Sequence, residues 1–150
     1  MVCSLKSSAI SRQYINALDL NRGVTEGNYQ DLAVWNKSHQ LVLNVYKVTK
    51  TFPHEELYGL TSQIRRAALS IPTNIAEGSG RGGDKEFARF CQISYGSINE
   101  LEYHFLVARD LGFIDSATYQ PLQQALVEIR RMLAKLIATL QQKLKPATDS

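Results

Sequence analysis

Hydrophobic residues recur at steps of three and four through most of the chain beyond residue 28, and this period predicts α-helices that each bury one face. The pattern divides into four segments, which we expect at about residues 30–51, 54–79, 84–111 and 116–145. Only short stretches separate these segments, so neighbours in the sequence should pack antiparallel. The sequence therefore predicts an all-α, up-and-down antiparallel four-helix bundle over residues 29–145.

Each segment carries an apolar stripe that should face the core. The first segment has two neighbouring rows, Leu32, Trp35, Val42, Tyr46 and Val34, Leu41, Val45, Val48. The stripe of the second is Leu57, Leu60, Ile64, Ala67, Ile71, Ile75 and Gly78. The stripe of the third is Phe87, Cys91, Ser94, Ile98, Leu101, Phe105 and Ala108. The stripe of the fourth is Leu122, Leu126, Ile129, Leu133, Leu136 and Leu140. The third is the most regular, because its steps alternate between four and three as in antiparallel bundles.

Proline and capping residues mark where these segments begin, end or bend. Pro53 ends the first segment, because a proline disfavours helical geometry in the residue before it. Asp84 is the expected N-cap of the third segment, and Asp115 or Ser116 that of the fourth. Pro72 falls inside the second segment, where it removes a backbone hydrogen bond, so we expect that helix to be kinked at Pro72.

A structural motif surrounds this proline. Asn74 should repair the broken hydrogen bonding, and Glu77 should pair with a neighbouring arginine, roles that we favour over catalysis. Gly78 opens the glycine-rich stretch that ends the helix. Gly96 lies in a predicted helix interior, where glycine costs about 1 kcal/mol relative to alanine. We therefore expect another helix, of this chain or of a second subunit, to approach Gly96 closely.

The two ends of the chain lie outside the periodic pattern. Residues 1–28 show no sustained periodicity, and we expect them to form a poorly ordered N-terminal extension. A second hypothesis is that translation starts at Val24, since every recognisable pattern lies beyond it. Residues 146–150 should form a flexible tail, because Pro146 prevents the fourth helix from continuing.

Composition adds a few constraints. The net charge of +3 gives a mild preference for anionic partners. No apolar run approaches the ~20 residues that span a bilayer, and the N-terminal residues lack the apolar core of a signal peptide. We therefore expect a cytoplasmic protein without a membrane partner. Cys3 lies in a polar region and Cys91 in an apolar stripe, so we expect no disulfide, and an inert buried thiol at Cys91.

No motif for catalysis, metal binding or cofactor binding is recognisable. A di-iron bundle needs a Glu-x-x-His pair on each of two helices, and the sequence contains none. The three histidines, His39, His54 and His104, lie on three different segments without a second ligand at metal spacing. We therefore predict a non-enzymatic protein with no metal and no cofactor. The one enzymatic hypothesis left open would use Glu77 and Glu100 as buried carboxylates.

Basic side chains offer the remaining functional signal. Five of them are candidates for phosphate contacts: Arg65, Arg66, Arg81, Lys85 and Arg89. Arg65 and Arg66 lie off the apolar stripe of the second segment, and Lys85 and Arg89 lie one turn apart on the third. Such contacts would be independent of base sequence and sensitive to salt. Since no basic run alternates with aromatic residues, base-specific recognition is not predicted.

Four motifs in order carry a family resemblance. They are residues 46–53 (YKVTKTFP), 59–68 (GLTSQIRRAA), 70–78 (SIPTNIAEG) and 96–102 (GSINELE). Over about residues 32–140 the chain resembles the bacterial four helix bundle protein family. The members of that family include proteins encoded in intervening sequences of 23S ribosomal RNA genes, and the accessory variability protein of diversity-generating retroelements.

The resemblance implies a four-helix protomer that assembles into a homopentamer with a basic surface. In the retroelement branch such an assembly binds nucleic acid and a reverse transcriptase during cDNA synthesis, and no enzymatic activity is associated with the family. We therefore expect an oligomeric scaffold that binds RNA or DNA, with a reverse transcriptase as a protein partner if the chain belongs to that branch. The alternative is a structural protein–protein interaction module whose charge serves only solubility.

Overall fold

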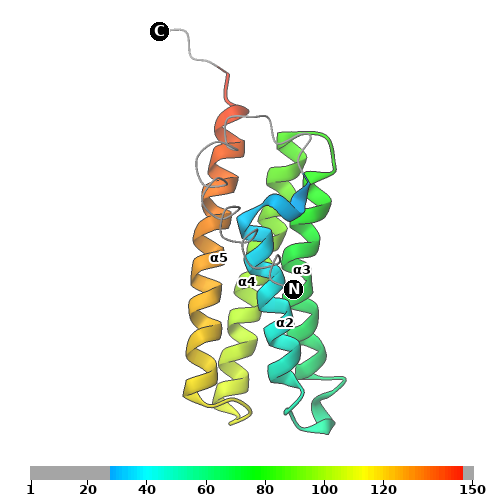
Figure 1. The fold of residues 1–150 in the computed structure, drawn as a ribbon, viewed down its shortest axis with the longest axis vertical. Coiled ribbons are helices and arrows are strands. Elements are labelled where there is room, and N and C mark those ends of the chain that lie inside the picture. The colour runs from blue at the N-terminus through cyan, green and yellow to red at the C-terminus, as the bar shows by residue number, and fades with distance from the viewer. Residues whose placement is uncertain (1–27, 147–150) are drawn as a thin grey trace, which may run out of the picture.

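The computed structural model describes residues 28–146, whose four long helices form one up-and-down bundle (Figure 1). The helices are α2 Ala33–Thr49, α3 Leu60–Ser79, α4 Asp84–Asp110 and α5 Ser116–Lys143. Two short 3-10 turns, η1 Tyr29–Asp31 and η2 His54–Glu56, precede α2 and α3. Each helix packs against its neighbours in sequence, and α2 packs against α5 to close the bundle. The predicted all-α, four-helix fold is therefore confirmed, while the extension and the tail lie almost entirely outside the described residues.

None of the four helices is at once long and apolar enough to cross a membrane, within the part of the chain that the structure describes.

The starts of α2 and α3 differ from the predicted segments. Leu32 is extended, and Asn28 caps η1 by accepting a hydrogen bond from the Gln30 amide at 3.2 Å. The second predicted segment breaks between η2 and α3, and α3 begins only at Leu60. There the Glu56 carboxylate accepts a hydrogen bond from the Leu60 amide at 3.1 Å, satisfying one of the free amides of a helix N-terminus.

The ends of α4 and the start of α5 follow standard capping rules. Gly83 occupies the N-cap position of α4 and Asp84 is its first residue, so the predicted cap at Asp84 is wrong by one position. Asp115 is the N-cap of α5, as predicted, because its carboxylate accepts a hydrogen bond from the Thr118 amide at 2.8 Å. Hydrogen bonding with Thr118, first with its side chain and then with its amide, lowers the pKa of the Asp115 carboxyl. Between them, Gly112 ends the turn after α4 with φ of +78°.

The core is built from the predicted stripes of α3, α4 and α5. In α2 the buried face differs from the predicted apolar rows, since Tyr46 is 37% exposed while Ser38 and Thr49 are buried. Both hydroxyls donate to the carbonyl four residues earlier, at 2.7 Å for Ser38 and 2.8 Å for Thr49, which makes their burial possible. Cys91 is fully buried, and this burial raises the pKa of its thiol to about 12, as expected of an inert cysteine.

The interface between α3 and α4 contains a polar seam around Pro72. Helical geometry continues through Pro72 from Leu60 to Ser79, and the bend at this proline stays a prediction. Asn74 donates to the Ser70 carbonyl at 2.8 Å rather than to the carbonyl of Ala68, which is the one that loses its donor to the proline. The expected repair of that hydrogen bond by Asn74 is therefore wrong. Ser94 of α4 donates to the Ile71 carbonyl at 2.8 Å and so joins the two helices.

Close approach between helices occurs at Gly78 and not at Gly96. A Cβ atom built on Gly78 would lie 2.6 Å from the Cβ of Phe90, closer than two carbon atoms can pack. Gly96 is exposed, and no other part of residues 28–146 lies within 4 Å of the position of its Cβ. The expectation of a helix packed on Gly96 is thus wrong within residues 28–146, while its second form, contact with another subunit, stays a prediction.

Candidate nucleic-acid interface

The five candidate basic residues fall into two groups at different heights of the bundle. Arg65 and Arg66 lie in the first half of α3, whereas Arg81, Lys85 and Arg89 surround the loop that joins α3 to α4. Fifteen residues separate Arg66 from Arg81, which corresponds to about 22 Å along a helix. The structure therefore does not bring the five together into one surface, and we call the second group the loop-end group.

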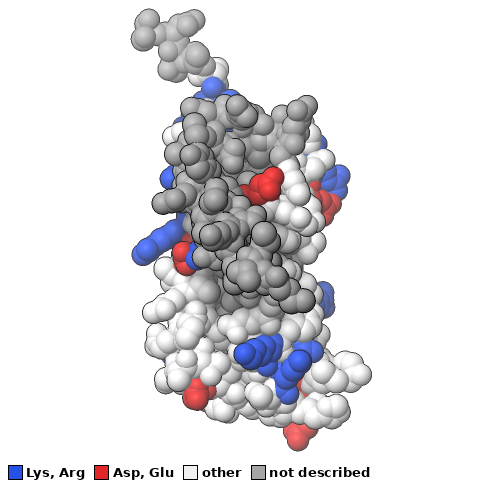
Figure 2. Space-filling model, viewed as in Figure 1, with Lys and Arg blue, Asp and Glu red and all other residues white. Residues whose placement is uncertain are grey.

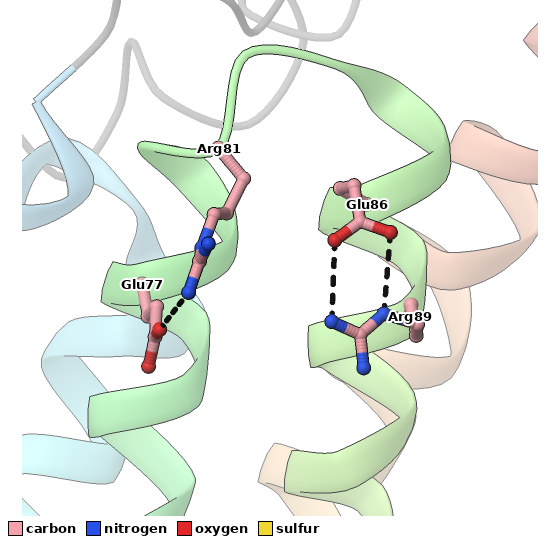
Figure 3. A network of polar contacts seen from close by, with 4 residues as sticks. All are labelled: Glu77, Arg81, Glu86 and Arg89. Carbon is pink, nitrogen blue, oxygen red and sulfur yellow. Dashed lines mark hydrogen bonds and ion pairs between the residues drawn. The ribbon is translucent and has the colours of Figure 1, made fainter.

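Acidic neighbours neutralise most of the loop-end group (Figure 3). Arg81 pairs with Glu77 at 2.5 Å, as predicted for Glu77, and Arg89 pairs with Glu86 at 3.2 Å. The hydrogen bond from Arg89 lowers the pKa of Glu86 and raises that of Arg89. Both guanidinium groups also lie against the Phe90 ring, at 5.3 Å and 4.5 Å from its centroid. A phosphate would have to compete with these contacts.

Lys85 is the exception within the loop-end group. Its side chain is exposed and forms no ion pair with any residue from 28 to 146. Lys85 can therefore contact a phosphate without first breaking an ion pair, whereas Arg81 and Arg89 beside it are paired.

Arg65 has a different environment, in which no carboxylate of residues 28–146 pairs with it. Its Nε donates to the Thr49 hydroxyl at 2.9 Å, and its guanidinium carbon lies 4.8 Å from the centroid of the Tyr46 ring. Both contacts come from the last turns of α2, which runs antiparallel to α3. A hydroxyl and an aromatic ring fix the position of the guanidinium without cancelling its charge. Arg65 is therefore both held in place and electrostatically active.

We call four cations at the end of α2 and in the first half of α3 the α2–α3 basic patch: Lys47, Lys50, Arg65 and Arg66. None of the four forms an ion pair within residues 28–146, and all except the half-buried Arg65 are exposed. Figure 2 shows lysine and arginine side chains gathered on the lower part of the face that α2 and α3 present in Figure 1. Lys47 and Lys50 were missed by sequence reasoning, although they lie one turn apart on the first segment.

Arg130 on α5 has a structural role. It pairs with Glu102 of α4 and donates to Asn99 at 3.2 Å, which links α5 to α4. Gln123 also donates to Glu102, at 2.7 Å, and these two hydrogen bonds lower the pKa of the Glu102 carboxyl. The side chains involved are mostly shielded from solvent, so this cation is committed to the bundle.

The acidic residues of the enzymatic hypothesis do not form a site. Glu77 and Glu100 are both exposed, so the premise that they are buried carboxylates is wrong. No group of three or more histidine, cysteine or acidic side chains comes close enough to hold a metal ion anywhere in residues 28–146.

Comparison with known proteins adds two findings. The family described as 23S rRNA-intervening sequence protein matches residues 30–135. A solved structure from the S23 ribosomal protein family of Bacteroides thetaiotaomicron, a protein of unknown function, has a TM-score of 0.65 to this one. The two are 24% identical over 69% of this chain and 97% of that chain, a likeness that establishes the fold alone. No curated protein matches the chain.

Proposed function

Because the chain belongs to the 23S rRNA-intervening sequence protein family, we propose that it is a non-enzymatic, oligomeric scaffold that binds RNA or DNA through phosphate contacts. The α2–α3 basic patch is the observation that carries this proposal. Its four cations have no carboxylate partner in the described chain, so they can replace the counterions of a nucleic-acid backbone. Arg81 and Arg89 would first have to give up their ion pairs, and they are the weaker candidates.

Recognition by this patch is independent of base sequence. Lysine and arginine contacts to phosphates position a protein on nucleic acid without reading the bases. Tyr46, the aromatic ring that contacts Arg65, already has one face covered by the guanidinium at 4.8 Å. The protein therefore binds structured RNA and duplex DNA with similar affinity, and both affinities fall as salt rises.

Assembly into a homopentamer is part of the same proposal, and it rests on the family resemblance. Repeating the basic patch around a ring raises the affinity for a long nucleic acid, because every contact after the first is intramolecular. Light scattering on the purified protein tests the assembly, with an expected mass about five times the 16.8 kDa of one chain. If the chain belongs to the retroelement branch, its protein partner is a reverse transcriptase, which co-expression followed by co-purification tests.

A paired-variant experiment tests the patch. Lys47→Gln/Arg66→Gln removes two unpaired cations, and the control Lys37→Gln/Arg109→Gln removes two cations that are paired with Glu128 and Asp110. Binding to duplex DNA is measured across a salt series by fluorescence anisotropy. We expect the slope of log affinity against log salt to fall by about 1 for each patch cation removed, and to change little in the control. Equal slopes for the two double variants would refute the role of the patch.

The loop-end group has its own test. Charge reversal in Lys85→Glu/Arg89→Glu should weaken RNA binding at low salt without unfolding the bundle, chiefly through Lys85, since Arg89 is already paired with Glu86. Unchanged affinity, with an unchanged circular dichroism spectrum, would remove this group from the interface.

The alternative function, a protein–protein interaction module, is favoured by exposed apolar side chains. Leu69 on α3 and Ile93 on α4 are 41% and 42% exposed, and Tyr103 on α4 is 63% exposed. Apolar side chains of this size are common anchors of protein interfaces. If neither RNA nor DNA binds at low salt, this module becomes the better account and the basic patch is solvated surface.

A further inference from the structure

A pocket of about 310 Å³ opens at the lower end of the bundle in Figure 1, where α2 ends and α3 begins. Its wall combines the last turn of α2, the loop that carries η2, and the first two turns of α3. The polar side chains that line it are Thr49, Lys50, His54, Thr61 and Arg65. Among residues 28–146 no carboxylate lines it, so the pocket concentrates cationic groups and hydrogen-bond donors.

The Thr61 hydroxyl is a polar group of the pocket that lacks a hydrogen-bond partner in the described part of the chain. The residue is only 2% exposed, and its hydroxyl has no hydrogen-bond partner within residues 28–146. Buried hydroxyls in folded proteins almost always have a partner, because losing hydration without replacement is costly. Arg65 lies one helical turn after Thr61, so both side chains reach the pocket from the same face of α3.

The contacts around Arg65 leave its two Nη groups available for a ligand. Thr49 binds its Nε and Tyr46 covers one face of the guanidinium, whereas its two Nη groups have no hydrogen-bond partner in residues 28–146. Two adjacent N–H groups held in a plane match the geometry of a phosphate oxygen pair. The amide of Leu60, the first of α3, is already bonded to Glu56, so we assign recognition of a ligand here to the side chains.

We propose that this pocket binds a phosphate monoester, whose oxygens accept hydrogen bonds from Arg65 and Thr61 and whose charge pairs with Lys50. The two cations and the imidazole that line the pocket suit a dianionic terminal phosphate, and the nearby Glu56 carboxylate is already bonded to the Leu60 amide. The proposal deepens the proposed function, because Lys50 and Arg65 also belong to the basic patch. The phosphate monoester belongs either to the end of a nucleic acid or to a free mononucleotide, since both carry a terminal phosphate.

The first experiment measures the thermal shift of the full chain with inorganic phosphate, against chloride at matched ionic strength. We expect phosphate to raise Tm in the wild type and in Arg131→Gln, which removes an exposed cation of α5 outside both the basic patch and the pocket. In Arg65→Gln the apparent phosphate affinity should fall about tenfold or more. If the wild type shows no shift, or if Arg65→Gln and Arg131→Gln respond equally, the proposal is overturned.

Thr61→Val provides a second variant that should fold even if Arg65→Gln does not. Valine has nearly the shape of threonine without the hydroxyl, so we expect a higher Tm than wild type in chloride and a smaller shift in phosphate. A higher Tm with an undiminished phosphate shift would mean that only a buried water serves Thr61, and would overturn its assignment to the ligand.

RNA oligonucleotides with a 5′-phosphate or a 5′-hydroxyl separate the two sources. A preference of about tenfold for the phosphorylated end that disappears in Thr61→Val assigns the pocket to nucleic-acid ends. Equal binding of the two RNAs, with the inorganic phosphate shift retained, assigns it to mononucleotides. If the protein shows no salt-dependent binding of RNA but inorganic phosphate still raises its Tm, the proposed function is refuted and the phosphate pocket is retained.

Discussion

Replacing Gly78 by alanine should destabilise the bundle, although alanine is the better helix former. The new Cβ would lie 2.6 Å from the Cβ of Phe90 and 3.0 Å from Cδ2 of the Phe87 ring. Carbon atoms pack at about 3.5–4.0 Å, so α3 and α4 must separate by roughly 1 Å there. Overpacking of this kind costs about 1–3 kcal/mol, and helix propensity returns at most about 1 kcal/mol. The expected net loss is about 1–2 kcal/mol.

Gly96→Ala is the matched control, because it makes the same chemical change in α4 at a position where no other part of residues 28–146 lies within 4 Å of the new Cβ. Within a single protomer it should stabilise by up to about 1 kcal/mol. At about 3 °C per kcal/mol for a chain of this size, Tm should fall by about 3–6 °C in Gly78→Ala and rise by up to about 3 °C in Gly96→Ala.

The assay is thermal and urea unfolding followed by far-UV circular dichroism, at one fixed protein concentration because assembly makes Tm depend on concentration. A Gly78→Ala protein as stable as the wild type would refute the close approach of α3 and α4. A drop in Tm for Gly96→Ala together with a smaller mass in solution would place Gly96 in a contact between subunits instead.

Two further predictions concern titratable groups in the bundle. In a Cys3→Ser background, Cys91 should not react with Ellman's reagent at pH 8 until denaturant is added, because it is fully buried and its pKa is raised to about 12; reaction of the native protein would contradict this burial. The pKa of Glu102 is lowered by hydrogen bonds from Gln123 and Arg130, so its stabilisation is present above its unfolded pKa of about 4.3 and is lost as pH falls through the lower folded value. Urea unfolding between about pH 5 and pH 3 should therefore show a shallower loss of stability in Glu102→Gln than in wild type, by about 0.5 kcal/mol after solvent screening, and identical pH profiles would refute it.

Much of the functional surface depends on pairs of residues that are far apart in the sequence. Arg65 was recognisable as a cation off the apolar stripe, but its partners Thr49 and Tyr46 belong to another helix. Arg81 and Arg89 looked equally available, yet the side chains of Glu77 and Glu86 neutralise them. Those two acids lie three and four residues away on the same helical turns, so the sequence did contain the signal for this neutralisation.

The sequence alone determined the number of helices, most of their buried faces and most of their ends, because hydrophobic period and capping are local properties that any helix of that composition shares. It misplaced the start of α3, where the Glu56 carboxylate and the short η2 turn replace the first turn of the predicted helix. It also assigned the close helix contact to Gly96 rather than Gly78.

Only the tertiary structure decided which glycine meets a neighbouring helix, which cations keep their charge and where the pocket with Thr61 opens. The physical reason is that the period of a helix fixes the direction in which each side chain points, but not the depth, the rotation or the neighbour of that helix in the bundle. The depth, rotation and neighbours of each helix are set when the stripes of all four helices pack together. Side-chain contacts of about 2.5–3.5 Å depend on that packing.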